Sequence, residues 1–199
     1  LYATARPEGP VVVREEKPAP EKDKAHTLYH RALERMEDGK FDKALLDLQR
    51  AEQLAPSDAL IAAALRRAKQ LAGVVKAREL FREAESIADK SPQDALRLLE
   101  DAIHLDPSHA SYHREAARLY LQVGNALDKA EVHLGAAVHL APSDPAPRIH
   151  LTQLLERAGR PREALWACEA ALNLFPGDKE LQKLSQRLKR KTEGGTGAA

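Results

Sequence analysis

The segment PREALWACEAALNLFPGD, residues 161–178, has three other copies in the chain. They read FDKALLDLQRAEQLAPSD (41–58), PQDALRLLEDAIHLDPSH (92–109) and LDKAEVHLGAAVHLAPSD (127–144). Each copy has an alanine, an apolar residue four positions later, a second alanine three positions further on, and a proline five positions after that. A leucine stands two residues before each proline. This recurrence predicts a protein built from internal repeats.

The recurring residues predict pairs of closely packed helices. Apolar residues return at helical spacing almost throughout, and no stretch alternates with the period of two that strands require. The alanines lie on one helix face, where their small side chains let a neighbouring helix approach. Each proline ends a helix because it cannot continue the hydrogen-bonding pattern. Ser or Asp occurs within two residues after the closing proline of each copy, as in Ser57-Asp58 and Gly177-Asp178. Caps of this kind contribute about 1 kcal/mol each.

The spacing of the prolines gives the length of the repeat. Pro107 and Pro142 are 35 residues apart, and Pro142 and Pro176 are 34 apart. The 51 residues from Pro56 to Pro107 equal one unit and about half of another. This half-unit, residues 59–75, is amphipathic. We expect a separate helix that turns at Gly73, the alternative being one long helix that runs on through Ile87.

These units resemble the tetratricopeptide repeat, a helical hairpin with small residues at fixed sites and a closing proline. The best match is the last unit, with Leu151, Thr152, Leu155, Gly159, Ala164, Cys168, Ala171 and Pro176. The resemblance covers about residues 25–176. It implies an all-α fold, an α-α superhelix or solenoid of about four hairpins with an extra half-unit helix. Residues 179–191, with three leucines on one face, are expected to form a C-terminal capping helix.

Three regions are expected along the chain. Residues 1–24 carry four prolines among alternating charges and predict a disordered linker, with a strand from an upstream domain as the alternative. Residues 25–191 form the repeat domain, and residues 192–199 a disordered tail. The chain begins at Leu1 and its only methionine is Met36, so we expect a piece of a longer protein. The Ala-, Leu- and Arg-rich composition suggests a bacterial source.

Composition and motifs argue against several classes of function. The net charge of +1 gives no overall attraction to nucleic acid or membrane. The single cysteine rules out an internal disulfide framework and fits a cytoplasmic protein. No apolar run reaches the length of about 18 residues that indicates a membrane helix. No phosphate-binding loop, nucleophile elbow or pair of catalytic carboxylates occurs, so we expect neither an enzyme nor a cofactor.

Two histidine pairs have a spacing that could bind a metal, His26 with His30 and His109 with His113. Each pair would share a helix face. No cysteine lies nearby and no glutamate completes a zinc-protease motif, so we expect surface histidines and no metal site.

Three other features have both a structural and a functional interpretation. Cys168 occupies a packing position, which predicts a buried and unreactive thiol. Trp166 lies on the same helix and is expected to be half-buried. The basic run 187–191 could contact nucleic acid, but basic residues also suit the last turn of a helix, and the sequence has no aromatic platform for bases. We therefore expect no nucleic-acid partner.

The resemblance to the repeat family implies a binding groove lined by the first helix of each hairpin. The positions that match this groove in the third and fourth units are Arg114, Arg118, Gln122, His150, Gln153 and Arg157. A basic, hydrogen-bonding groove suits a peptide or helix of a partner protein, acidic in character or ending in a free carboxylate. Glu115 and Glu156 stand nearby and can pair with these arginines. The predicted function is a non-catalytic scaffold for protein–protein interaction.

Two further functional hypotheses remain open. Neither is the clamp by which some members of the family hold the C-terminal carboxylate of heat-shock chaperones with paired Lys and Asn. The matching sites here are the apolar Tyr29 and Leu33, so we do not expect such a clamp. The first open hypothesis is that the chain is a regulatory or accessory segment of a larger chaperone or signalling protein. Self-association through the Ala-rich helix from Ile61 to Val75 is a further possibility.

Overall fold

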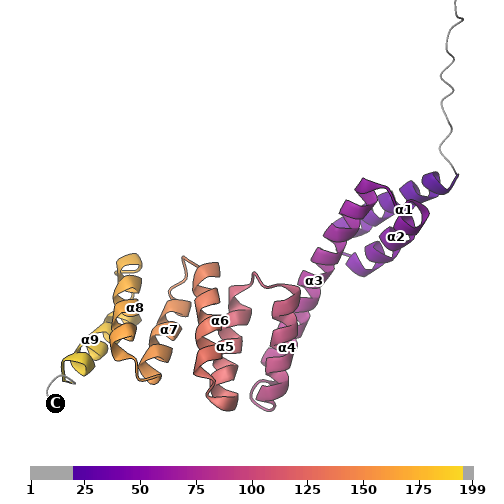
Figure 1. Ribbon diagram of the computed structural model, residues 1–199. Helices are drawn as coiled ribbons and strands as arrows, with labels where there is room; N and C mark the ends of the chain where they lie inside the picture. Colours follow the sequence, from indigo (N-terminus) through magenta and orange to yellow (C-terminus); the bar gives the residue numbers. More distant parts are fainter. Residues whose placement is uncertain (1–19, 195–199) are drawn as a thin grey trace, which may run out of the picture. The chain divides into compact units, whose positions relative to one another are not determined.

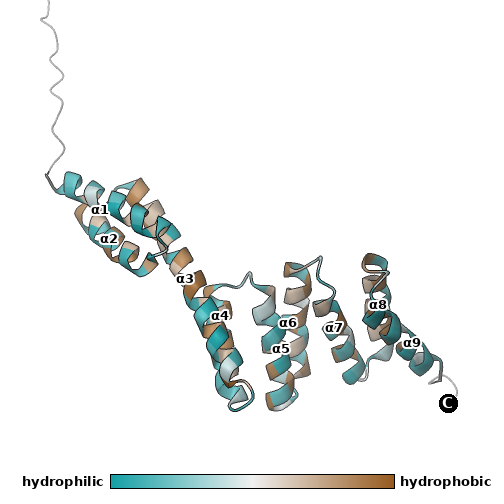
Figure 2. Ribbon diagram, turned by 180° about the vertical axis from the view of Figure 1, so that it is seen from behind, coloured by the Kyte–Doolittle hydropathy of each residue, from teal (hydrophilic) through white to brown (hydrophobic). Residues whose placement is uncertain are grey.

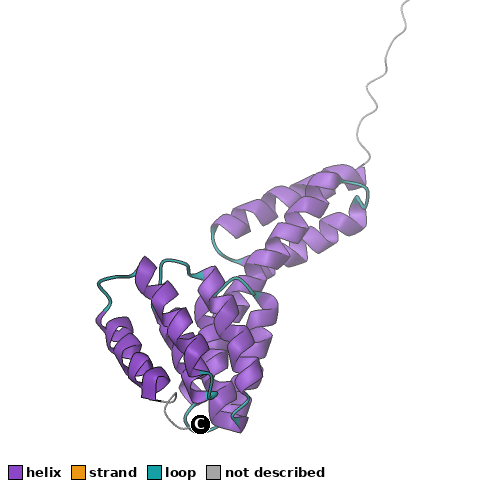
Figure 3. Ribbon diagram, turned by 60° about the vertical axis from the view of Figure 1, so that its left-hand side comes forward, coloured by secondary structure: helices purple, strands orange, loops and turns teal. Residues whose placement is uncertain are grey.

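The structure, a computed structural model, describes residues 20–194 of the chain. Within this range the chain forms α-helices joined by short turns, and Figure 3 shows no strand among the described residues. The chain divides into two compact units, the first ending at Leu71 and the second beginning at Ala72. This confirms the prediction of an all-α repeat fold.

The first unit contains helices α1 (Pro20–Glu37) and α2 (Phe41–Leu54) and the beginning of α3 (Ala59–Ile87). The turn between α1 and α2 contains Gly39 at a φ of +73°, a left-handed conformation that glycine adopts without strain. The part of α3 in this unit covers the α1–α2 hairpin through a cluster of small and aliphatic residues. The buried members of this cluster are Ala32, Ala44, Leu48, Ala64, Leu65 and Ala68.

The second unit contains the rest of α3 and six further helices. They are α4 (Pro92–Leu105), α5 (Ala110–Gly124), α6 (Leu127–Leu140), α7 (Ala146–Arg157), α8 (Pro161–Leu174) and α9 (Lys179–Gly194). Figure 1 shows α4 to α9 side by side in chain order, and each of these helices packs mainly on its neighbours in the sequence. The last helix uses Leu181, Leu184 and Leu188 to cover α8, as expected of a capping helix.

The recurring alanines and leucines act as the sequence pattern predicts. Both alanines of each copy are buried: Ala44, Ala51, Ala95, Ala102, Ala130, Ala137, Ala164 and Ala171. Figure 2 shows apolar and polar residues alternating along the helices, as amphipathic helices require. The second helix of each hairpin ends at the leucine two residues before the proline: Leu54, Leu105, Leu140 and Leu174.

Aspartates cap several of the helices that follow the prolines. Asp58 Oδ1 accepts hydrogen bonds from the backbone N–H groups of Leu60 (2.9 Å) and Ile61 (3.3 Å) at the start of α3. Asp178 Oδ1 accepts from Glu180 and Leu181, both at 2.9 Å, at the start of α9. Each carboxylate satisfies backbone donors that have no partner inside the first helical turn.

The expectation of two helices with a turn at Gly73 is wrong. Residues Ala59–Ile87 form a single helix, so the extra half-unit is fused to the first helix of the second repeat. A glycine inside a helix costs only about 1 kcal/mol relative to alanine. Apolar contacts on both sides outweigh that cost, because Ile61 is buried in the first unit and Ala77 in the second.

The boundaries of the repeat region also differ slightly from the prediction. Helix α1 begins at Pro20, so residues 20–24 are helical rather than part of a linker, and a proline is well tolerated in a first helical turn. Helix α9 continues to Gly194, beyond the expected end at residue 191. The rest of the predicted linker and tail, residues 1–19 and 195–199, lies outside the described residues.

Within residues 20–194, no helix combines the length and the apolar character needed to cross a lipid bilayer.

The helix segment for which self-association was predicted contributes to packing within the chain. Ile61, Leu65 and Ala68 are buried in the first unit, whereas Val75 is exposed. Self-association through this segment stays a prediction.

Candidate functional site

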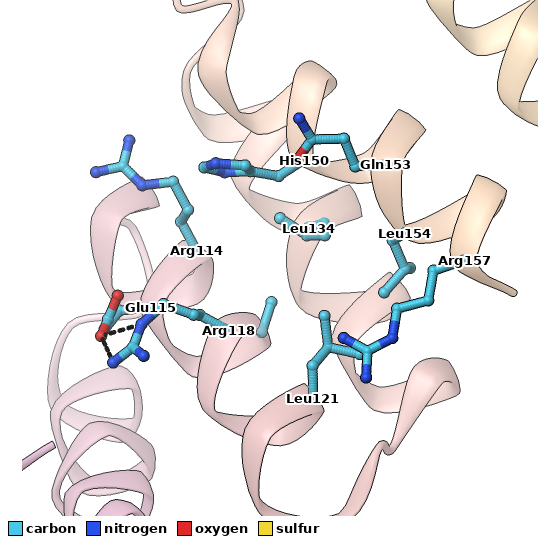
Figure 4. A pocket seen from close by; sticks show the side chains of 10 residues that line it. Arg114, Glu115, Arg118, Leu121, Leu134, His150, Gln153, Leu154 and Arg157 are labelled. Atoms are coloured by element: carbon cyan, nitrogen blue, oxygen red, sulfur yellow. Dashed lines mark hydrogen bonds and ion pairs between the residues drawn. The ribbon is translucent and has the colours of Figure 1, made fainter. Parts of the chain in front are cut away.

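A pocket of about 290 Å³ lies between α5, α6 and α7. Its floor is apolar and consists of Ala117, Leu121, Leu134 and Leu154, one or two from each helix. Figure 4 shows the leucines grouped between the polar side chains of α5 and α7. These residues belong to the same aliphatic core that holds the helices together. Sequence reasoning did not assign them to the site, although their helical periodicity marks them as inward-facing.

The rim of the pocket carries most of the residues that the repeat pattern predicted for a groove. Helix α5 supplies Arg114 and Arg118, and α7 supplies His150, Gln153 and Arg157. The spacing of three or four residues places these side chains on one face of each helix (Figure 4). The sixth predicted residue, Gln122, does not line the pocket.

Arg118 is the rim cation with the most hydrogen-bond partners. Its Nε donates to Glu115 Oε1 at 2.7 Å, and Nη2 donates to the same oxygen. Its Nη1 donates to Gln122 Oε1 at 2.9 Å, so Gln122 supports the rim indirectly. The bond to Glu115 raises the pKa of Arg118, which is therefore a permanent cation. Glu115 thus partly neutralises this arginine, as the sequence suggested.

The other two arginines of the rim retain more of their charge. Arg114 Nη1 lies 3.7 Å from Asp144 Oδ2, a distance too long for a hydrogen bond. Arg157 has no ion-pair partner in the described part of the chain. The second acid expected to dilute the charge, Glu156, instead pairs with α9, where Arg187 Nη2 and Lys191 Nζ lie 2.5 and 3.4 Å from its oxygens. The rim therefore has three cations and a single carboxylate.

His150 adds a neutral hydrogen-bonding group to the rim. Its imidazole is partly desolvated, and this burial, followed by the nearby Arg114 guanidinium, lowers the pKa of His150 below its ordinary value. A neutral imidazole can both donate and accept hydrogen bonds. Beside it, Gln153 Nε2 donates to Glu180 Oε1 of α9 at 3.1 Å. The rim thus contains amide and imidazole groups next to its cations.

The two histidine pairs have different environments, and one prediction about them is wrong. His26 Nε2 lies 3.0 Å from Asp58 Oδ2, and the exposed His109 stacks on the buried ring of Tyr112. His113 is buried instead of exposed, because it lies on the inner face of α5. Its Nε2 is 3.0 Å from the Pro107 carbonyl oxygen, and its Nδ1 is 3.1 Å from His133 Nδ1. Among residues 20–194, no cluster of three or more His, Cys, Asp or Glu could hold a metal ion.

Cys168 and Trp166 lie on opposite sides of α8. Cys168 is fully buried, its thiol lies 3.4 Å from the Leu181 carbonyl oxygen, and burial raises its pKa. This thiol is therefore poorly reactive, as predicted. Trp166 is 75% exposed, so the expectation of a half-buried tryptophan is wrong. Two residues along a helix differ by about 200° in direction, which turns Trp166 away from the packed face of Cys168.

Comparison with known proteins supports the fold but not a particular family member. No family model and no curated protein matches the sequence. Among solved structures, the P58(IPK) tetratricopeptide domain superposes with a TM-score of 0.61 at 19% identity, over 86% of this chain and 47% of that one. The first tetratricopeptide domain of Spaghetti (RPAP3), solved with an HSP90 peptide, superposes with a TM-score of 0.54 at 17% identity, over 60% of this chain and 95% of that one.

A plant protein gives a similar result. The Arabidopsis OM64 tetratricopeptide domain superposes with a TM-score of 0.53 at 19% identity, over 60% of this chain and 98% of that one. All three structures share the paired helices and short turns described above, although identity stays below a fifth. The chain therefore has the tetratricopeptide-repeat fold.

Proposed function

We propose that this chain is a non-catalytic scaffold that binds an acidic segment of a partner protein in the pocket between α5 and α7. The observation that carries this proposal is the arrangement of Arg114, Arg118 and Arg157 around an apolar floor with only one carboxylate among them. Guanidinium groups bind carboxylates through paired, charge-assisted hydrogen bonds. The apolar floor is suited to one aliphatic or aromatic side chain of the same segment.

The size of the pocket also favours a peptide side chain. A volume of about 290 Å³ lies at the lower limit of small-molecule sites, which span roughly 300–1,000 Å³. The pocket is partly open to solvent, so a longer chain can continue beyond it. Two similar structures give this proposal further support, since two tetratricopeptide domains of RPAP3 were solved with peptides of HSP90 and HSP70.

A direct test uses a fluorescein-labelled peptide, Glu-Asp-Leu-Asp-Glu, and its neutral counterpart Gln-Asn-Leu-Asn-Gln, with binding measured by fluorescence anisotropy. The acidic peptide is expected to bind the chain at least about tenfold more tightly than the neutral one, a difference of about 1.4 kcal/mol. The double variant Arg114→Gln, Arg157→Gln should remove this difference.

The matched control is Arg66→Gln, Arg67→Gln, which removes two exposed cations of α3 that line no part of the pocket. This control should bind the acidic peptide as the parent chain does. Equal binding of the two peptides, or equal losses in the two variants, would reject recognition of acidic segments by this pocket.

A further inference from the structure

The basic residues of α9 stand in register with the groove residues of α5 and α7. Counted from the prolines at 107, 142 and 176, the position 11 residues on holds Arg118, Gln153 and Arg187. The position 15 residues on holds Gln122, Arg157 and Lys191. In a repeat array, equivalent positions of successive units lie along the same surface. Helix α9 therefore repeats the groove face of the hairpins before it.

We propose that the exposed face of α9 is a second contact surface for the acidic partner segment, which continues from the pocket across this helix. This inference rests on the proposed function and extends it. The face consists of Lys183, Gln186, Arg187, Arg190 and Lys191, which together line a shallow hollow. The role of α9 as a capping helix involves only its opposite face, where three leucines pack on α8.

Helix α9 carries much more positive charge than the chain as a whole. It contains six basic and two acidic residues, a net charge of +4, whereas the net charge of the whole chain is +1. A capping helix needs a polar outer face for solubility, but such a face does not need one sign of charge. The excess of one sign therefore favours an anionic partner.

The ion pairs between α7 and α9 neutralise only part of this charge. Arg187 and Lys191 share a single carboxylate, that of Glu156. Lys183 and Arg190 have no ion-pair partner among residues 20–194. Glu156 belongs to α7, the helix that carries the rim residues Gln153 and Arg157, and Gln153 itself donates to Glu180 at the start of α9. An acidic chain leaving the pocket over α7 would meet these cations next.

The environment of α9 favours a protein segment over a membrane or a nucleic acid. Membrane-surface helices insert apolar residues between their basic ones, but Leu181, Leu184 and Leu188 are at most 4% exposed. Single-stranded nucleic acids need aromatic rings on which bases stack, and the basic face of α9 has none. The apolar floor of the adjoining pocket suits peptide side chains.

The test extends the labelled peptide Glu-Asp-Leu-Asp-Glu by four glutamates at its N-terminus or at its C-terminus, with four glutamines as length controls. For the parent chain, one glutamate extension should tighten binding by about fivefold, the effect of two exposed ion pairs, and the glutamine extensions should not. In the variant Lys183→Gln, Arg190→Gln the gain should disappear, while the affinity for the short peptide stays unchanged. The variant Arg66→Gln, Arg67→Gln should keep the full gain.

The outcomes separate this inference from the proposed function. If the short acidic peptide binds and neither extension improves its affinity, the role of α9 is rejected while the pocket proposal stands. If the chain binds the short acidic peptide no more tightly than its neutral form, the pocket proposal fails. Tighter binding of a labelled 20-residue oligouridylate than of either extended peptide, lost in Lys183→Gln, Arg190→Gln, would overturn the inference in favour of a nucleic acid.

Discussion

Helices α1 and α5 each carry two arginines four residues apart, and the two pairs have different surroundings. On α1, Arg31 and Arg35 both donate to Asp47 of α2, a carboxylate that is only 1% exposed. On α5, Arg114 and Arg118 reach no carboxylate of α6 and instead line a pocket open to solvent. The first pair joins the two helices of a hairpin, whereas the second pair lines a pocket, with Arg118 bonded to Glu115 and Gln122 of its own helix.

Position along the helix accounts for this difference. Arg35 stands four residues before the turn glycine Gly39, and Arg118 stands six before Gly124. Each residue advances a helix by about 100°. A shift of two residues therefore points the side chains of Arg35 and Arg118 towards nearly opposite faces of their helices. The partner residue changes as well, because the site of Asp47 in α2 is occupied by His133 in α6. Identical residue types therefore join two helices in one hairpin and line an open pocket in another.

The largest effect expected from this comparison is a loss of stability in the first unit. The double variant Arg31→Gln, Arg35→Gln leaves the buried Asp47 carboxylate without a bonded cation, with only the longer-range charge of Arg50 nearby. This loss should lower the free energy of unfolding by about 3 kcal/mol. Hydrogen exchange of the backbone amides of α1 and α2 would measure the change.

The matched double variant Arg114→Gln, Arg118→Gln should change the stability of the second unit by less than about 1 kcal/mol, since exposed ion pairs contribute little. Similar losses from the two double variants would mean that the two arginine pairs do not differ in the way described.

A smaller effect of opposite sign is expected at a buried polar group without a partner. The hydroxyl of Thr152 in α7 is fully buried and makes no hydrogen bond within the described structure. Thr152→Val keeps the shape of the side chain and removes the unsatisfied group, so it should raise the stability of the second unit by about 1 kcal/mol. Urea unfolding followed by circular dichroism would measure the gain. A clear loss of stability would show that the hydroxyl has a partner after all.

The two units should also respond to acid in different pH ranges. A hydrogen bond from Arg31 holds the pKa of Asp47 below its ordinary value, while burial and then the neighbouring His113 lower the pKa of His133. In both cases the folded chain binds the proton less readily than the unfolded chain, so stability falls as the pH falls. The loss begins below about pH 6.5 for His133 and below about pH 3.9 for Asp47.

As the pH falls from 7.5 to 5, the second unit should therefore lose stability first. Urea unfolding at each pH would measure the loss, and hydrogen exchange corrected for intrinsic rates would identify the unit. His133→Gln should reduce this loss, leaving the smaller contribution of His150, which has the same sign. If the first unit weakens earlier, the interpretation of Asp47 and His133 is wrong.

Much of the fold was predictable from residues close together in the sequence. The alanines and prolines of the four copies located the paired helices, and each second helix ends at the predicted leucine. Five of the six residues predicted for the groove lie around one pocket, because the repeat pattern carries information about which helix face is shared. Their role in binding remains a prediction.

Features that depend on distant contacts were harder to predict. The continuity of α3 through Gly73 depends on packing partners on both sides of the glycine. His113 looked like a surface residue because its neighbour in space, His133, is 20 residues away. In the same way, nothing near Glu156 in the sequence indicated that it would pair with Arg187 and Lys191 of α9.

The sequence by itself determined that this chain is a series of helical hairpins, because helix formation and helix termination depend on residues within one or two turns. The tertiary structure decided which cations are neutralised and which remain available, because an ion pair needs two side chains brought together from different helices. The charge of the groove is thus a property of packing, while the helices that carry it are a property of local sequence.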